Sequence, residues 1–206
     1  MGEYADYLPD RPDGERFGAD VVRKARPEDA DTIIELTCAR HNLEPQVVRP
    51  RIENELAGIE RGDPSCVFVA QIGHHLVGFG RARQLQHARD GLPLALPEGW
   101  YLTGVIVDPT WRRRGLGELL TAARLEWIAR RTDAAYYVAS RENRASIALH
   151  ERFGFHEIAR GFAYPRADLT ADRSVAYELT LPSAGDGSAG SAATRGDAGG
   201  RSRRIT

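Results

Sequence analysis

Short apolar runs alternate along the chain with segments in which apolar residues recur every three or four positions. Apolar or alternating runs bounded by turn residues predict β-strands, and the three-to-four spacing predicts amphipathic helices. The expected strands cover residues 21–25, 66–72, 76–85, 100–107, 135–139, 156–160 and 175–181. The expected helices cover residues 27–40, 46–61, 116–128 and 145–153. This succession predicts an α/β domain with a mixed sheet and helices on both faces.

Proline and glycine mark the limits of these elements. Pro27 suits the first turn of a helix, and Pro45 separates the first helix from the second. Residues 86–99 contain one glycine and two prolines before Gly99 and are expected to form a loop. Two interpretations of this loop stand equally: a surface excursion, or a loop that selects the substrate, because loops at the ligand end of a sheet often carry recognition.

Composition limits the classes of function. The 206 residues suffice for one domain with a proper core, and a formal net charge of −1 argues against a dedicated nucleic-acid or membrane-surface binder. No apolar run approaches the ~20 residues of a membrane span, and no secretory signal is visible. The two cysteines, Cys38 and Cys66, lack the spacing of a metal or redox site. We therefore expect a cytoplasmic protein without a metal centre.

The two ends differ in composition from the middle of the chain. Residues 1–20 are acidic and rich in proline and glycine, and we expect an N-terminal arm there, either ordered or loose. Residues 21–182 form the expected domain. Residues 183–206 are rich in glycine, alanine and serine, and this composition buries too little apolar surface to offset chain entropy. We expect a disordered tail.

A basic, glycine-rich turn stands between the strand at 100–107 and the helix at 116–128. Residues 112–117 read Arg-Arg-Arg-Gly-Leu-Gly. Such a turn presents backbone N–H groups at a helix N-terminus, where a pyrophosphate can bind, and the arginines add charge-assisted hydrogen bonds. The spacing is that of neither a Walker loop nor a Rossmann loop. The turn therefore predicts a phosphorylated ligand of another kind.

Two motifs resemble those of the GCN5-related N-acetyltransferases, the GNAT family. The turn at 112–117 resembles the Arg-x-x-Gly-x-Gly loop that binds acetyl-CoA in that family. Residues 143–155 read Asn-Arg-Ala-Ser-Ile-Ala-Leu-His-Glu-Arg-Phe-Gly-Phe and resemble the family's Asn-x-x-Ala-x-x-Leu-Tyr-x-x-x-Gly-Phe segment. The resemblance covers roughly residues 66–160. It implies a GNAT fold, with a mostly antiparallel central sheet and helices on both faces, and acetyl-CoA as co-substrate.

The resemblance also implies where the cofactor binds. The backbone of the central strand would pair with the pantetheine arm, and one of its N–H groups would polarise the acetyl carbonyl, with Gly104 consistent with a bulge. The turn and the start of the next helix would hold the pyrophosphate, and Asn143 would contact the pantetheine arm or simply cap its helix. The implied cofactor-binding residues are Val105, Ile106, Val107, Arg112, Arg113, Arg114, Gly115, Leu116, Gly117, Glu118 and Asn143.

The catalytic acid and base are less clear from the sequence. The family usually places a tyrosine at the position of His150, and a histidine with an ordinary pKa of ~6.5 suits proton donation at neutral pH. The alternative is a structural histidine, in which case Tyr164, in an expected substrate-side loop, is the second candidate for the acid. No acidic residue occurs on the strand before Asn143, so the base is not visible. A water relay to Glu98 or Glu35 is the remaining option.

Three functions are compatible with these motifs. The first is direct acetyl transfer to a primary amine of a small molecule, with aminoglycoside-type antibiotics, and hence antibiotic resistance, as one substrate class. The second is acetylation of a protein N-terminus or lysine, because residues 143–155 resemble the ribosomal-protein alanine acetyltransferases. The third is a non-catalytic acyl-CoA-binding module, which the missing base favours. The family resemblance also allows a homodimer, although no specific interface is visible.

Overall fold

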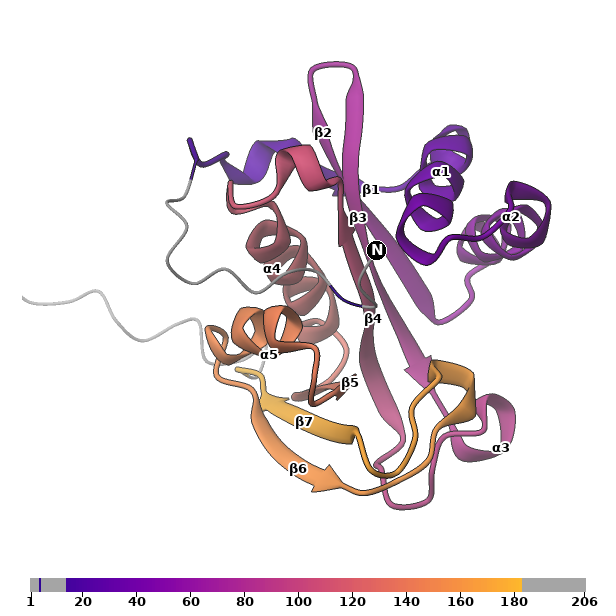
Figure 1. Ribbon diagram of the computed structural model, residues 1–206, viewed down its shortest axis with the longest axis vertical. Helices are drawn as coiled ribbons and strands as arrows, with labels where there is room; N and C mark the ends of the chain where they lie inside the picture. Colours follow the sequence, from indigo (N-terminus) through magenta and orange to yellow (C-terminus); the bar gives the residue numbers. More distant parts are fainter. Residues whose placement is uncertain (1–3, 5–13, 183–206) are drawn as a thin grey trace, which may run out of the picture.

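The computed structural model describes Tyr4 and residues 14–182, and Figure 1 gives its elements. The rest of the expected N-terminal arm and the whole expected tail at 183–206 lie outside the described residues. The strands are β1 (Val22–Lys24), β2 (Ser65–Ile72), β3 (His75–Leu85), β4 (Gly99–Val107), β5 (Ala134–Ser140), β6 (His156–Arg160) and β7 (Ser174–Thr180). The α-helices are α1 (Ala30–His41), α2 (Pro45–Glu60), α3 (His87–Asp90), α4 (Leu116–Ala129) and α5 (Arg144–Glu151). Short 3-10 turns cover Ala19–Val21 (η1), Pro27–Asp29 (η2), Pro109–Trp111 (η3) and Pro165–Ala167 (η4).

The strands form one mixed sheet in the order β1-β2-β3-β4-β5-β7-β6. All neighbouring strands are antiparallel except β4 and β5, which are parallel. Helices α1 and α2 lie on one side of the sheet and α4 and α5 on the other (Figure 1). The predicted mixed sheet with helices on both faces is confirmed.

Three apolar clusters hold these layers together. The largest lies between the sheet and α4, where Leu116, Leu120 and Ile128 point from the helix into the core. The second packs α1 and α2 on the other face of β2, β3 and β4. The third joins the loop after β3 to the loop between β6 and β7, with Leu92 and Leu169 among its buried members. The third cluster positions two segments that are far apart in the sequence.

The expected boundaries differ from the observed ones in a few places. The first helix begins with η2, in which the Asp29 carboxylate accepts from the Arg26 amide and binds the Arg23 guanidinium. The expected loop at 86–99 contains the short helix α3. The helix expected at 145–153 ends at Glu151, and Gly154 follows with φ of +87°, the conformation that favours glycine after a helix.

Candidate functional site

A split in the sheet defines the site. The parallel pair β4 and β5 is matched only at Tyr101 and Tyr136, although both strands continue beyond this point. The strands therefore part, and the β5-facing edge of β4 after Tyr101 has no strand partner. One cleft runs through this split. We call the part lined by residues 102–118 and 143–152 the cofactor end, and the part lined by residues 40–90 and 164–169 the acceptor end.

A β-bulge lies where the two ends of the cleft meet. Gly80 pairs with Val105 and Ala82 with Leu102, so that Thr103 and Gly104 together stand opposite the single residue Arg81. Gly104 has φ of +78°, and a Cβ there would meet nothing within 4 Å. Glycine is required by the backbone conformation rather than by crowding. The bulge expected at Gly104 is confirmed.

A fully buried arginine from α4 supports this bulge. The guanidinium of Arg124 donates from Nη1 to the carbonyl oxygens of Arg81 at 3.2 Å and Gly104 at 3.3 Å, and from Nη2 to the Thr121 hydroxyl at 2.8 Å. Burial lowers the pKa of Arg124 to about 9, so that the group is charged at neutral pH. Arg124 therefore places a positive charge directly behind the bulge.

The predicted pyrophosphate turn has an unusual backbone. Arg113 has φ of +64° and Gly115, which precedes the first residue of α4, has φ of +80°. The turn leads directly into the N-terminus of α4, whose first N–H groups have no partner within the helix. All the predicted residues from 112 to 118 line the cleft except Arg114. The Arg114 guanidinium instead lies over the Trp111 ring, 5.1 Å from its centre.

The N-terminal segment lies along this turn. The Gly14 amide donates to the Arg113 carbonyl at 3.0 Å, and the Phe17 amide donates to the Arg114 carbonyl at 3.3 Å. The Glu118 carboxylate is paired with Arg16 from this segment and with Arg152 after α5. These ion pairs bring two further arginines to the mouth of the cofactor end, where a phosphate would bind.

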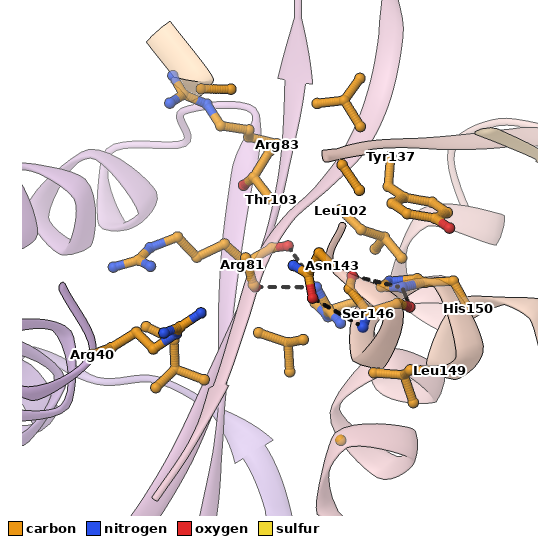
Figure 2. A pocket seen from close by; sticks show the side chains of 18 of the residues that line it. Arg40, Arg81, Arg83, Leu102, Thr103, Tyr137, Asn143, Ser146, Leu149 and His150 are labelled. Carbon is orange, nitrogen blue, oxygen red and sulfur yellow. Dashed lines mark hydrogen bonds between the residues drawn. The ribbon is translucent and has the colours of Figure 1, made fainter. Parts of the chain in front are cut away.

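Asn143 lines the cleft and also begins α5. Its Oδ1 accepts a hydrogen bond from the Ser146 amide at 3.2 Å, which is the helix-capping role expected for it. The same side chain is exposed to the cofactor end, next to Ser146 and Leu149 (Figure 2). A cap and a cofactor contact are compatible at this position, because the carboxamide has further hydrogen-bonding capacity.

His150 lies at the cofactor end but is only 3% exposed. Its ring stacks on Tyr137 with 4.1 Å between centroids, and its Nδ1–H donates to the Ser146 carbonyl at 2.8 Å. The expectation of an ordinary pKa is wrong: burial, together with the charge of Arg124, lowers the pKa of His150 to about 3. The neutral ring leaves Nε2 as a buried acceptor without a partner. Proton donation from Nε2 therefore requires this nitrogen to be protonated first, which a pKa of about 3 disfavours at neutral pH.

The other candidate acid and bases lie elsewhere. Tyr164 lines the acceptor end and is 5% exposed, and burial raises its pKa, so that its hydroxyl keeps its proton at neutral pH. Glu98 accepts from the His87 amide, Glu35 is exposed on α1, and neither lines the cleft. The carboxylates at the acceptor end include Glu55, which pairs with Arg81.

Sequence reasoning missed several residues that line the cleft. Arg124 had a readable signal, because it falls on the apolar stripe of its helix, four residues after Leu120 and four before Ile128. A charged residue at such a position is buried only when hydrogen bonds or an opposite charge offset the cost of removing it from water. Arg81, Thr103 and Tyr137 had no such signal, since their burial depends on the bulge and on the split between β4 and β5.

Comparison with known proteins decides the family. The sequence model of the acetyltransferase (GNAT) family matches residues 30–155. The chain belongs to this family. No curated protein is similar enough in sequence to be matched. As a GNAT acetyltransferase, the protein is an acyltransferase that uses acetyl-CoA as co-substrate.

Several solved structures share the fold. The ribosomal-protein-alanine N-acetyltransferase from Brucella melitensis is 19% identical, with a TM-score of 0.58 over 78% of this chain and 99% of that chain. The PaiA N-acetyltransferase from Thermoplasma acidophilum, in complex with coenzyme A, is 14% identical, with a TM-score of 0.57 over 78% and 98%. A phosphinothricin acetyltransferase from Sinorhizobium meliloti, in complex with AcCoA, is 16% identical, with a TM-score of 0.57 over 78% and 87%.

The residues of the cofactor end fit acetyl-CoA. The glycine conformation at Gly115 leaves backbone N–H groups accessible at the start of α4, as a pyrophosphate requires. The open edge of β4 offers main-chain donors and acceptors to the amide groups of a pantetheine arm. Within the described part of the chain, no helix is long and apolar enough to cross a membrane.

Proposed function

We propose that this acetyltransferase transfers an acetyl group directly to a primary amine of a small molecule. The observation that carries the proposal is the continuity of the cleft from the pyrophosphate turn, past the β4 bulge, to the acceptor end. The loops on either side of the acceptor end are tied together, because Arg166 in η4 donates to the Arg89 carbonyl in α3 at 3.1 Å. Joined loops favour a bounded site for a small acceptor over a long peptide groove.

The reaction needs an oxyanion donor and a proton donor where the cofactor end and the acceptor end of the cleft meet. The neutral amine bonds to the acetyl carbon as the carbon–sulfur bond breaks, and the proton that the amine loses balances the one that the leaving thiolate takes up. In this proposal, a backbone N–H beside Gly104 stabilises the developing negative charge on the carbonyl oxygen. The positive charge of Arg124 behind the bulge supports that role. His150 and Tyr164 remain the candidates for the proton donor, with Tyr164 favoured by its protonated hydroxyl.

The experiment is release of thiol from acetyl-CoA with a panel of amines: aminoglycosides, polyamines, amino acids, and peptides with free N-termini or lysines. Turnover with small amines supports the proposal. Turnover with aminoglycosides alone identifies a drug-modifying enzyme, as in antibiotic resistance. Turnover confined to peptides supports protein acetylation instead. Tight acetyl-CoA binding without turnover on any amine supports a non-catalytic acyl-CoA-binding module.

His150→Ala and Tyr164→Phe separate the two candidate acids. Loss of the true proton donor lowers kcat by ~100-fold or more and leaves acetyl-CoA affinity nearly unchanged, because general acid catalysis contributes roughly that factor. A fall in kcat for Tyr164→Phe alone assigns the donor role to Tyr164. A fall for His150→Ala alone assigns it to His150 and requires that its Nε2 be protonated during the reaction.

A further inference from the structure

The acceptor end of the cleft is rich in arginine. Among the described residues, six arginines and four carboxylates line it, and no lysine does. The arginines are Arg40, Arg51, Arg81, Arg83, Arg89 and Arg166. They come from α1, α2, β3, α3 and η4, so that no single sequence motif holds them. Figure 2 places Arg40, Arg81 and Arg83 on the opposite side of the strands from Asn143, Ser146 and His150.

One of these arginines has unused hydrogen-bonding capacity in a buried position. Arg81 is 7% exposed, and its Nε donates to the Glu55 carboxylate at 2.8 Å, but its Nη2 is buried and has no partner. The Thr103 hydroxyl, from the bulge opposite Arg81, is also buried without a partner. An unpaired buried donor is costly, and its presence beside a cleft indicates a ligand group that satisfies it.

The positive charges of the acceptor end lie close enough to act on one another. Partial removal from water lowers the pKa of His41, and Arg40, Arg51 and Arg81 lower it further. Burial lowers the pKa of Arg81, with Glu55 opposing and Arg51 and Arg83 adding to the effect. The nearby carboxylate of Asp90 is engaged by Arg89 at 2.9 Å and more distantly by Arg83 at 3.5 Å. An anion that binds among the arginines relieves the repulsion between their positive charges.

We propose that the acceptor amine carries an oxyanion group, a carboxylate or a phosphoryl group, bound by Arg81 and Arg83 with the Thr103 hydroxyl. The proposal rests on the proposed acetyl transfer and names its substrate class. An anionic group held at this position would leave the amine free to reach the bulge on β4. Polycationic amines, including aminoglycosides, would meet more positive than negative side chains there and are disfavoured.

The test uses one amine scaffold with different charges: L-serinamide, L-serine and O-phospho-L-serine. Spermidine and kanamycin serve as cationic acceptors. We expect kcat/KM to rise by ~10- to 100-fold from the amide to the better anionic member, the range typical of hydrogen bonds to charged groups. Serine and phosphoserine distinguish a carboxylate from a phosphoryl site. Calorimetry with the protein–coenzyme A complex measures the binding of each amine independently of turnover.

Variants assign the effect to the arginines. Arg83→Gln, whose side chain is 48% exposed, should fold normally and should reduce the preference for anionic amines by ~10-fold without changing the KM for acetyl-CoA. Arg81→Gln should reduce this preference for anionic amines further. If Arg81→Gln folds poorly, Arg51→Gln replaces it, because Arg51, like Arg83, is exposed. Arg130→Gln, at the exposed residue that follows α4 and lies outside the cleft, is the matched control.

The outcomes are distinguishable. The inference is supported if the wild type prefers anionic amines and this preference is smaller in Arg83→Gln. The inference is overturned if kcat/KM for the amide and the cationic amines equals or exceeds that for the anionic amines and the arginine variants do not change these values. That result would leave the proposed acetyl transfer to small amines intact. Failure of every anionic amine to bind the coenzyme A complex also overturns it. Loss of acetyl transfer to all small amines, with anionic ligands still bound by the arginines, contradicts the proposed function instead.

Discussion

The two ends of the cleft are built in different ways. The cofactor end uses backbone: a positive-φ turn at Arg113 and Gly115, the first N–H groups of α4 and an unpaired strand edge on β4. The acceptor end uses side chains, chiefly arginines from α1, α2 and β3 and from the loops at α3 and η4. Backbone recognition suits a ligand that is the same throughout a family, whereas side-chain recognition can change without altering the fold.

His150 lies at the cofactor end, and the pH dependence of stability tests whether its ring is buried and neutral. Its folded pKa of about 3 lies below the ordinary value of 6.5, so that the unfolded chain binds the proton more readily. The free energy of unfolding should therefore fall as the pH drops from 6.5 towards 3, by ~1.4 kcal/mol per pH unit at most. His150→Phe, which keeps an aromatic ring on Tyr137, should reduce this slope to the part contributed by His41, whose pKa is also lowered.

Urea unfolding at pH 7, 6, 5 and 4 measures that effect. Three described aspartates, Asp29, Asp90 and Asp172, have pKa values below the usual 3.8, so that most of their contribution is lost only below pH 4. His156→Gln is the control, because His156 is exposed on β6. Parallel slopes in the wild type and His150→Phe would contradict a buried neutral imidazole.

Arg124→Leu tests whether the two ends depend on the same bulge. The substitution removes the donor to the Gly104 and Arg81 carbonyls, and each unsatisfied buried carbonyl costs ~1–3 kcal/mol. We expect kcat to fall by ~10- to 100-fold and use of the acceptor to weaken as well. Steady-state kinetics with the acceptor from the amine panel measure both. Arg130→Leu, at the exposed residue that follows α4, should have little effect. An unchanged kcat in Arg124→Leu would show that the bulge needs no support.

Gly115→Ala tests the backbone character of the cofactor end. A side chain at φ of +80° costs ~1–2 kcal/mol and shifts the N–H groups of the turn. The KM for acetyl-CoA should rise by ~10-fold, while the preference among acceptors should not change. Gly73→Ala is a matched control, since Gly73 has φ of +57° at the tip of the β2–β3 hairpin and free space around it. Equal KM values in the two variants would argue against a phosphate site at the turn.

Arg16→Gln tests the contribution of the N-terminal segment, and we expect the smallest effect. Arg16 is paired with Glu118 and half exposed, and exposed charges contribute ~0–1 kcal/mol. The KM for acetyl-CoA should rise by ~2- to 5-fold at low salt, with a smaller change at high salt because of screening. Arg26→Gln, in an exposed pair with Glu28 away from the cleft, is the control. A rise in the KM for acetyl-CoA that is as large at high salt as at low salt would indicate that Arg16 has a direct structural role.

Much of the fold follows from local sequence. The apolar periodicity placed each strand and each long helix within a few residues of its observed position, because alternation and helical spacing depend on neighbours in the chain. The short helix α3 was missed, since its four residues are too few to show a period. The helix at Pro27 was placed correctly but begins as a 3-10 turn, which depends on a long side chain from β1.

The sequence by itself determined the turn and the helix cap that line the cofactor end, and the tertiary structure alone brought the residues of the acceptor end together. Residues 112–118 are contiguous, so that their glycines, charges and helix N-terminus can be read directly, as can the cap at Asn143. The environment of His150, the burial of Arg124 and the free Nη2 of Arg81 depend on the split between β4 and β5 and on the bulge at Gly104. Burial and charge are properties of what surrounds a side chain, and for these residues the surroundings come from distant parts of the sequence.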